Sequence, residues 1–256
     1  MKNQEESYIY GRNPVIEAIR NDAPIEKIYL QFGIDEKLRN DIIIKAKKKK
    51  INCSQIDKQK FLALEREITG KNNVSQGIIA IKGTVKYFTL DELISNSFET
   101  TKNPVIVLLD EINDPHNLGA IARTAECSGA AGIIVTERNS APITPTAIKA
   151  SAGALEYLPV AKQSSVIQTI EKLKENGFWV IGTDIEAEIA YDELDYETPI
   201  CLIMGNEGKG ISKAVAKHCD YTIQLPVLGK VQSLNVSVTA GIVLYEILRK
   251  RNILGE

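Results

Sequence analysis

The first 82 residues alternate short apolar runs with stretches in which apolar positions recur three or four residues apart. Runs of branched and aromatic side chains predict strands, and the wider spacing predicts amphipathic helices. Asn13 and Pro14 are placed to cap and open the first helix, and Asp57 to cap the third. The expected strands are residues 25–31, 53–56 and 77–81, and the expected helices start at Pro14 or cover 35–48 and 58–64.

Residues 83–103 follow a different pattern. They contain one short expected helix, residues 89–96, and then the polar stretch SFETTKN. Polar residues without apolar periodicity are typical of connecting segments. We therefore expect a compact α/β domain over residues 1–82, a linker over 83–103 and a second domain over 104–256.

From Pro104 onward, apolar strands and amphipathic helices alternate. The expected strands are 105–109, 131–136, 157–160, 178–183, 199–204 and 221–225, and the expected helices are 118–128, 143–152, 165–176, 212–218 and 235–251. Continuous apolar strands separated by helices are typical of a mainly parallel sheet covered on both faces. Ligands of such folds bind beyond the carboxyl ends of the strands, where three polar loops are expected: 113–117, 205–210 and 229–235.

The first loop leads into a helix, with Asn117 in position to act as its N-cap. Arg123 follows on that helix. An arginine there is most often a surface residue. The functional alternative is a phosphate clamp, because the planar guanidinium presents a fork of donors.

The second loop contains Gly205, Gly208 and Gly210 around Glu207. Glycines allow positive φ and close approach of a ligand to the backbone. The spacing matches neither G-x-G-x-x-G nor the Walker pattern, so these two nucleotide-binding motifs are excluded. A capping or hairpin turn explains the glycines equally well, and Glu207 can accept hydrogen bonds from a substrate or cap the next helix.

The third loop ends in Ser233, Leu234 and Asn235, directly before the apolar helix that closes the chain. Ser233 and Asn235 are both good N-cap residues, since a short side-chain oxygen can accept from the free backbone N–H groups of the first turn. Taken alone, this segment favours a helix cap and nothing more.

Composition excludes several classes of protein. The chain has 256 residues, 44% hydrophobic and 25% charged, an ordinary composition for a globular protein. No apolar run is long enough to cross a bilayer and no signal peptide is recognisable, so we expect a cytoplasmic protein. Two histidines and four scattered cysteines argue against a metal site or a disulfide framework. We expect the cysteines to be small, mostly buried apolar side chains.

The net charge of −2 counts mildly against a nucleic-acid-binding protein. The run from Lys45 to Lys50 is the exception. It fits the solvated C-terminal end of a helix, where cations are favoured, and it fits a contact with RNA equally well.

In this order and at these spacings, the three loops closely resemble the signature motifs of the SpoU (TrmH-type) RNA ribose 2′-O-methyltransferases, a family of the SPOUT class. The residues that carry the resemblance are Asn117 and Arg123, then Gly205 and Glu207, then Ser233-Leu234-Asn235. The stretches GRNPVIEAIRN and QGIIA resemble the small N-terminal domain of the L30e ribosomal-protein type, as in the RlmB-like branch. The resemblance covers nearly the whole chain.

The resemblance implies a C-terminal domain with a deep trefoil knot, a feature that base rates make improbable. It implies S-adenosylmethionine as cofactor and a homodimer formed through the C-terminal domain. The implied cofactor-binding residues are Met204, Gly205, Leu225, Val227, Gly229 and Leu234. The implied catalytic residues are Asn117, Arg123, Glu207, Ser233 and Asn235.

The implied substrate is RNA, a guanosine in the peptidyl-transferase region of 23S ribosomal RNA. The N-terminal domain would select it, and Arg12, Lys47, Lys48 and Lys49 are the candidate RNA-binding residues, with Tyr8, Tyr10 and Asn13 as further candidates. The acidic segment 184–195 has the wrong sign for RNA, and we expect it to lie away from the substrate.

Three other functions fit parts of the sequence. A transfer-RNA ribose methyltransferase would use the same chemistry, although the distinct N-terminal domain favours ribosomal RNA. A non-catalytic RNA-binding or ribosome-assembly protein would not need the complete set of catalytic residues. A nucleotide-binding oxidoreductase would need the missing G-x-G-x-x-G motif.

Overall fold

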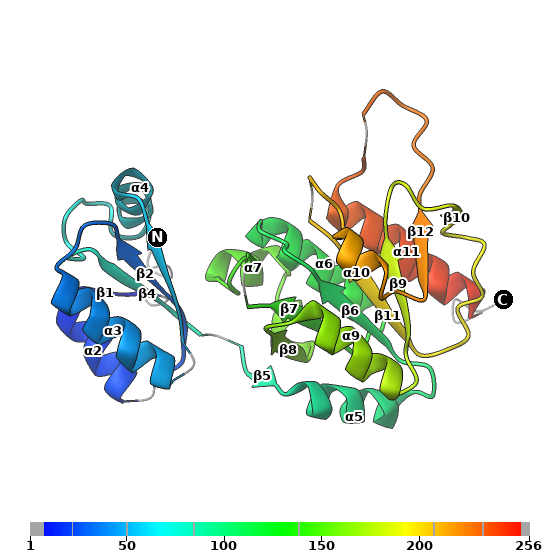
Figure 1. Cartoon of the computed structure of the whole chain (residues 1–256), viewed down its shortest axis with the longest axis horizontal. Coiled ribbons are helices and arrows are strands. Elements are labelled where there is room, and N and C mark those ends of the chain that lie inside the picture. The colour runs from blue at the N-terminus through cyan, green and yellow to red at the C-terminus, as the bar shows by residue number, and fades with distance from the viewer. Residues whose placement is uncertain are drawn as a thin grey trace. The chain divides into compact units, whose positions relative to one another are not determined.

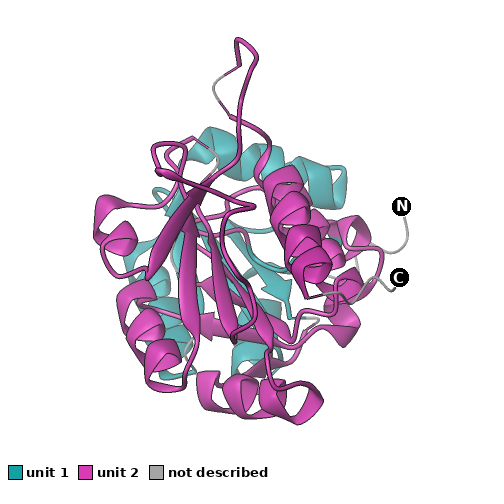
Figure 2. Ribbon diagram, turned by 90° about the vertical axis from the view of Figure 1, so that its right-hand side faces the viewer, with its two compact units in different colours: residues 1–84, 142–145 teal, residues 85–141, 146–256 magenta. Residues whose placement is uncertain are grey.

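The computed structural model of the chain describes residues 8–21, 23–49, 51–83, 85–137, 139–206, 208–231 and 233–251. The chain forms two compact units (Figures 1 and 2). Unit 1 comprises residues 1–84 and 142–145, and unit 2 comprises residues 85–141 and 146–256.

Unit 1 is built on a four-stranded sheet in the order β1-β4-β2-β3. Its strands are β1 (Tyr8–Tyr10), β2 (Ile25–Gln31), β3 (Asn52–Ile56) and β4 (Ile78–Lys82). The strand β4 runs antiparallel to β1 and β2, while β2 and β3 are parallel. The three strands expected from the sequence are thus confirmed, and β1 was not expected.

Helices cover both faces of this sheet. Residues of α2 (Arg12–Arg20) and α3 (Glu36–Lys48) pack with Ile28 and Leu30 of β2. Residues of α4 (Lys58–Thr69) pack with Tyr29, whose side chain leaves β2 on the opposite face. The alternation of side chains along a strand therefore gives unit 1 a core on each side.

One edge of the unit 1 sheet collects its loops, because β1, β2 and β3 end where β4 begins. Three backbone hydrogen bonds hold these loops side by side: Gly11 N to Ile78 O (3.1 Å), Gln31 N to Gly77 O (2.9 Å) and Phe32 N to Ile56 O (2.8 Å). The helices α2, α3 and α4 all start there. We call residues 11–13, 32–34 and 74–77 the loop edge of unit 1.

Unit 2 contains an eight-stranded sheet in the order β10-β12-β9-β11-β6-β7-β8-β5. Every neighbouring pair is parallel, which confirms the mainly parallel α/β fold expected from the sequence. The strands are β5 (Tyr87–Phe88), β6 (Val105–Leu109), β7 (Gly132–Thr136), β8 (Val160–Gln163), β9 (Trp179–Thr183), β10 (Ile189–Ala190), β11 (Ile200–Met204) and β12 (Tyr221–Gln224). The trefoil knot stays a prediction.

Helices lie on both faces of this sheet as well (Figures 1 and 2). Buried residues of α5 (Leu90–Thr100), α9 (Val166–Glu175) and α10 (Lys213–Ala216) share one core with the strands. The helices α6 (Pro115–Cys127) and α11 (Val236–Lys250) lie on the other face and pack on each other. The short helices α7 (Pro145–Ala150) and α8 (Ala154–Tyr157) complete the unit.

Two expected helix starts were wrong. The helix α2 begins at Arg12 after Gly11, whose φ of 94° is a conformation that glycine adopts easily, so Asn13 is not the cap. The helix α6 begins at Pro115 after Asp114, whose carboxylate accepts from His116 N at 2.8 Å. Asn117 is therefore not a cap either. Proline is favoured at the first helical position, so Pro115 makes the residue before it, Asp114, the N-cap.

The expected linker also needs correction. Residues 87–88 form β5, which pairs with β8, and α5 extends through the polar SFET stretch to Thr100. Thr89 and Glu92 form a capping box at its start, and Leu93 is fully buried in the core of unit 2. Most of segment 83–103 thus belongs to unit 2. The strand expected at 157–160 lies at 160–163, because residues 154–157 form α8.

The end of α11 is fixed by Arg251. Its guanidinium donates to Tyr196 O at 2.7 Å, to Thr198 O at 2.6 Å and to Asn103 O. Burial lowers the pKa of Arg251 below its usual value. These bonds tie the last helix to the segments that enter β6 and β11.

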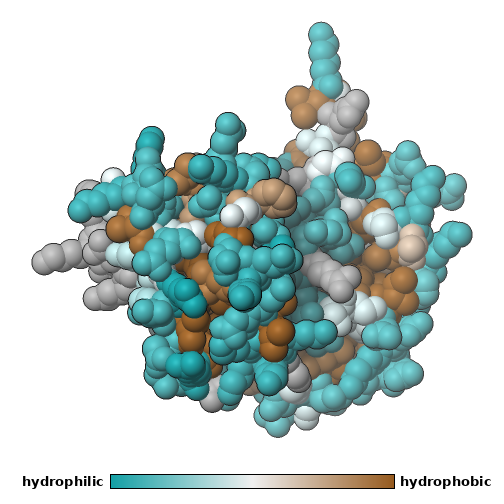
Figure 3. All heavy atoms as spheres, turned by 60° about the vertical axis from the view of Figure 1, so that its left-hand side comes forward, coloured by the Kyte–Doolittle hydropathy of each residue, from teal (hydrophilic) through white to brown (hydrophobic). Residues whose placement is uncertain are grey.

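The cysteines are free thiols, and the face in Figure 3 is mostly polar. All four cysteines are free; Cys201 is buried as expected, but Cys127 is exposed, contrary to expectation. The face shown in Figure 3 is largely hydrophilic, with hydrophobic patches between the polar side chains. Within the described residues, no helix has the length and hydropathy that a membrane crossing requires.

Candidate functional site

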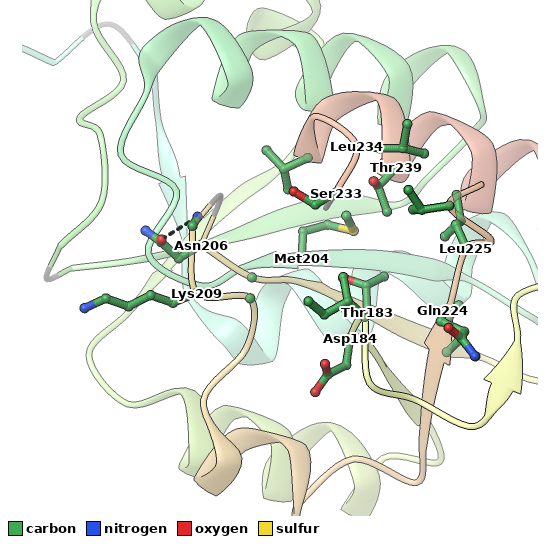
Figure 4. Close-up of a pocket in the computed structure, with 17 residues that line it drawn as sticks. Thr183, Asp184, Met204, Asn206, Lys209, Gln224, Leu225, Ser233, Leu234 and Thr239 are labelled. Carbon is green, nitrogen blue, oxygen red and sulfur yellow. Dashed lines mark hydrogen bonds between the residues drawn. The ribbon is translucent and has the colours of Figure 1, made fainter. Parts of the chain in front are cut away.

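A cleft with a volume of about 190 Å³ lies at the carboxyl ends of the adjacent strands β12, β9 and β11. The strand order reverses between β6 and β11, next to the cleft. From β6 the chain adds β7 and β8 on one side of the sheet, and it then adds β9, β11 and β12 on the other side. This is where open parallel sheets bind ligands. Figure 4 shows the lining residues. They are Thr183, Asp184, Ile185, Met204, Gly205, Asn206, Gly208, Lys209, Gly210, Ile223, Gln224, Leu225, Val227, Ser233, Leu234, Val236 and Thr239.

The turn after β11 has a tightly folded backbone. Asn206 and Gly210 exchange backbone hydrogen bonds of 3.1 and 2.8 Å, and Gly210 has a φ of 63°. A Cβ on Gly205 would lie 2.3 Å from both Gly210 C and Ile211 N. Gly205 is therefore required by the fold of its own loop, whereas the sequence suggested close approach of a ligand.

The loop after β6 is joined to this turn. The Nδ2 of Asn206 donates to Glu111 O at 3.0 Å, and the Nδ2 of Asn139 donates to Glu111 Oε1 at 2.8 Å. Glu111 has a φ of 57°, a strained conformation for a residue with a side chain. Burial, and then the neighbouring Glu111 carboxylate, raise the pKa of Asp110, which carries a half-buried carboxyl at the end of β6.

The third loop is joined to the first through two asparagines. Asn235 Nδ2 donates to Asn117 Oδ1 at 3.0 Å, and Asn117 is only 8% exposed. Asn235 also caps α11, because its Oδ1 accepts from Ser237 N at 2.8 Å. The cap expected from the sequence is confirmed, but the same side chain also holds a residue of α6.

The structure brings many of the predicted residues to the cleft. Of the predicted cofactor-binding residues, Met204, Gly205, Leu225, Val227 and Leu234 line it. Ser233 lines it too, and Asn235 stands between two lining residues. In Figure 4 the Lys209 side chain points away from Met204 and Ser233.

Two predicted residues do not line the cleft, and the position of a third is not described. Gly229 is exposed and does not line the cleft. Arg123 is exposed on α6 and is likewise not among the lining residues. Glu207 lies outside the described residues.

The loop after β9 borders the cleft, which was not expected from the sequence. Thr183 and Asp184 line the cleft. The expectation that segment 184–195 lies away from the RNA substrate stays a prediction. The rule that ligands bind at strand ends would have found this loop, because β9 is an apolar strand like β11. The two-residue strand β10 in the same segment is too short to show a period.

The candidate RNA-binding residues of unit 1 lie at opposite ends of its helices. Arg12 opens α2 at the loop edge, whereas Lys47, Lys48 and Lys49 are exposed at the end of α3, about 20 Å away along the helix. A polar groove of about 420 Å³ lies between α2 and α3, lined by Arg12, Asn13, Ile16, Glu17, Arg20, Asp41, Lys45 and Gln76. Tyr8 and Tyr10 instead pack in the core beneath α4.

Comparison with known proteins gives matches to both units. The sequence model of the SpoU rRNA Methylase family matches residues 104–245. The model described as RNA 2′-O ribose methyltransferase substrate binding matches residues 8–87. A putative TrmH family tRNA/rRNA methyltransferase, YacO of Bacillus subtilis, is 39% identical over 254 residues, covering 99% of this chain and 100% of the relative.

Solved structures agree in fold. The AdoMet-bound rRNA methyltransferase of Sinorhizobium meliloti matches with a TM-score of 0.61 at 24% identity, over 97% of this chain and 90% of that chain. The TrmH/SpoU tRNA modifying enzyme of A. aeolicus matches with a TM-score of 0.55 at 30% identity, over 65% of this chain and 84% of that chain.

Proposed function

The chain belongs to the SpoU rRNA Methylase family of RNA methyltransferases, and from this premise we propose that it methylates a ribose 2′-hydroxyl of RNA, using S-adenosylmethionine. The observation that carries the proposal is the bond between Asn117 and Asn235 beside the cleft. Two of the residues that resemble the family's catalytic set are held in contact there, although they are far apart in the sequence.

The cleft has the chemistry that this cofactor needs. Leu225, Val227 and Leu234 offer apolar surface to a flat adenine ring, and Thr183 and Ser233 offer hydroxyl groups. The cleft is open on one side, so the proposed cofactor need not be fully buried when RNA approaches. S-adenosylmethionine supplies an activated methyl group on a positively charged sulfur.

The chain's own residues have to orient the ribose and stabilise the charge that develops on its oxygen. A hydroxyl is a weak nucleophile until its proton is removed or shared. A guanidinium suits a phosphate clamp and a stabiliser of the developing alkoxide better than a base, and Arg123 is assigned these two roles. In this proposal Asn117, Asn235, Ser233 and Glu207 position the ribose and Arg123.

The proposed substrate is a guanosine of 23S ribosomal RNA, as in the RlmB-like branch. Support comes from unit 1, whose residues match a substrate-binding model, and from the groove that runs between Arg12 of α2 and Lys45 of α3. Three cationic and two acidic side chains line this groove, and an excess of cations can follow a phosphate backbone without reading its sequence. Unit 1 is thus assigned to RNA binding and unit 2 to methyl transfer.

The active form is proposed to be a homodimer formed through unit 2. Val238, Ile242 and Tyr245 are 49%, 37% and 46% exposed and recur at helical spacing along α11. The opposite side of α11 is already buried on α6, so this apolar stripe is free to pair with a second copy. Burying it would remove apolar surface from water.

The main alternative substrate is transfer RNA, which the description of YacO as a tRNA/rRNA methyltransferase includes. The A. aeolicus tRNA modifying enzyme matches only 65% of this chain, whereas this chain has an N-terminal segment, residues 8–87, that matches a substrate-binding model. This difference favours ribosomal RNA.

The experiment that tests the proposal offers labelled S-adenosylmethionine with two RNAs side by side, unmodified 23S ribosomal RNA and unmodified bulk tRNA. Label in ribosomal RNA alone supports the proposed substrate. Label in tRNA alone keeps the chemistry and overturns the substrate. No label in either RNA, with the cofactor still bound in a calorimetric titration, would contradict methyl transfer to free RNA and favour a binding protein.

A further inference from the structure

The loop edge of unit 1 carries an exposed aromatic side chain, Phe32, directly after β2. Phe32 is 71% exposed, although the bond from its own N–H to Ile56 O fixes its backbone at 2.8 Å. The next residue, Gly33, has a φ of 88°, and a Cβ there would meet nothing within 4 Å. The exposed ring thus extends from a strand end whose backbone is hydrogen-bonded to the neighbouring strand.

The adjacent loop, residues 73–76, is held in a strained form. Asn73 and Gln76 have φ values of 60° and 54°, which residues with side chains rarely adopt. The carboxylate of Glu65, only 1% exposed, anchors the loop by accepting from Asn73 N and Ser75 N at 2.7 Å each. Strain of this kind collects at binding sites, where the fold must hold one shape in advance.

This strained loop also connects Phe32 to the groove. The Oε1 of Gln76 accepts from Arg12 N at 3.3 Å, and Gln31 N donates to Gly77 O at 2.9 Å. The three loops of this edge, after β1, before β4 and after β2, therefore lie side by side in that order. Neighbouring strands are about 4.8 Å apart, so Arg12 and Phe32 start about 10 Å from each other.

Charge favours RNA as the occupant of this edge. Arg12 lines the groove, and among the described carboxylates none is within ion-pair distance of it, whereas Arg20 and Lys45 are paired with Glu17 and Asp41. A protein partner would favour a cluster of aromatic residues with little charge. A single exposed ring, with a guanidinium about 10 Å away that no described carboxylate pairs with, matches an unpaired nucleotide instead.

We propose that the loop edge of unit 1 binds one unpaired nucleotide of the RNA substrate, with its base stacked on Phe32 and its phosphate beside Arg12. Single-stranded RNA is commonly bound by stacking of splayed bases on aromatic rings, and any base has a flat face for this contact. The inference rests on the proposed RNA substrate. It adds that Phe32 selects an unpaired nucleotide over a helical stem, because only an unpaired base can stack on its ring.

Substitution of Phe32 tests the stacking. With the RNA that accepts methyl groups in the side-by-side assay, Phe32→Ala should raise KM for RNA about tenfold. The kcat and the Kd for S-adenosylhomocysteine should stay unchanged, because Phe32 is not among the residues that line the cleft. Phe32→Trp should restore the KM. Tyr157→Ala, which removes a 79% exposed aromatic ring from unit 2, is the matched control and should leave the KM as in the wild type.

A spectroscopic measurement separates stacking from a merely structural effect. Trp179 is the only tryptophan, so Trp179→Phe combined with Phe32→Trp places one fluorophore at the loop edge. Adding the RNA should quench its emission, and a duplex of the same length should not. If the wild type methylates RNA but Phe32→Ala has an unaltered KM, or the fluorophore at the loop edge is not quenched, the inference is overturned and the proposed function stands. Absence of any RNA binding by the wild type overturns both.

Discussion

Asn235 Nδ2 donates a 3.0 Å hydrogen bond to Asn117 Oδ1, which lies 118 residues earlier in the chain. The bond joins the N-terminus of α11 to α6. The Oδ1 of Asn235 is engaged separately, since it accepts from Ser237 N and from the Ser237 hydroxyl. One side chain thus caps α11 with its oxygen and positions α6 with its nitrogen.

These two uses can be separated by Asn235→Asp, which keeps the capping oxygen and removes the donor. We expect the melting temperature to stay within a few degrees of the wild type and kcat to fall about tenfold or more, the value of one lost hydrogen bond in the site. Thermal unfolding and steady-state methyl transfer measure the two effects. Asn235→Ala, which removes both groups, should lower kcat and also cost about 1 kcal/mol of stability. Full activity in Asn235→Asp would reduce Asn235 to a helix cap.

Gly205 and Gly229 were both expected to contact the cofactor, and the structure separates them. Gly205→Ala places a methyl group 2.3 Å from backbone atoms, so the turn must move at a cost of about 1–3 kcal/mol in the free energy of unfolding. We also expect weaker binding of S-adenosylhomocysteine by calorimetry. Gly229→Ala meets nothing within 4 Å and should behave as the wild type. Equal losses in the two variants would mean that Gly229 does contact the cofactor.

Arg123→Lys tests whether the planar guanidinium is needed. Lysine keeps the charge but loses the fork of donors, so we expect kcat to fall about tenfold to a hundredfold while the affinity for S-adenosylhomocysteine stays the same. The control is Arg249→Lys on α11, because Arg249 pairs with Glu246 at 2.6 Å and has no part in the proposed reaction. Near-normal turnover of Arg123→Lys would rule out the clamp.

The carboxylate of Glu65 makes the stability of unit 1 depend on pH. Burial alone would raise its pKa, but hydrogen bonds from Ser75 and Asn73 outweigh burial and hold the pKa below its usual value near 4.5. A depressed pKa stabilises the fold above the pKa of the unfolded state, and this contribution is lost as pH falls through the folded-state pKa.

Glu65→Gln should therefore cost about 1–3 kcal/mol of the free energy of unfolding at neutral pH. The difference from the wild type should shrink as pH falls below about 4.5. Denaturant unfolding at a series of pH values measures it. A difference that stays constant down to about pH 3 would show that the charge of Glu65 does not hold the loop.

The exposed stripe of α11 predicts the oligomeric state. Ile242→Lys places a charge in the middle of the proposed interface, and sedimentation velocity should then show a monomer where the wild type shows a dimer. Ile44→Lys makes the same change at a 56% exposed position of α3 in unit 1 and should leave the dimer intact. A wild-type chain that sediments as a monomer would contradict the dimer outright.

Periodicity was enough to predict most of the fold, because the strands of unit 2 are continuous apolar runs and the helices have one apolar face. It failed where several residues compete for one role: Asp114 and Asn117 are both good caps, and Pro115 decides between them. The two-residue strands β5 and β10 are too short to carry a period. The family's motifs identified Asn117 and Asn235, but no local pattern could predict that their side chains meet.

The acidic segment after β9 shows a second limit. Its sign argued against contact with RNA and gave no indication that Asp184, directly after β9, lines the cleft. Position in the sheet, rather than charge, decides which loops surround a ligand. The exposed ring of Phe32 was not recognised for a related reason, because an isolated phenylalanine in a sequence is typical of a buried core.

The most direct measurement is the position of the transferred methyl group. RNA labelled by the enzyme is hydrolysed in alkali, which cleaves the chain only where a free 2′-hydroxyl can attack the neighbouring phosphate. We predict that the label survives in alkali-resistant dinucleotides, and that Asn235→Asp yields the same product more slowly. Label released in mononucleotides would place the methyl group on a base and contradict the proposed 2′-O-methyl transfer.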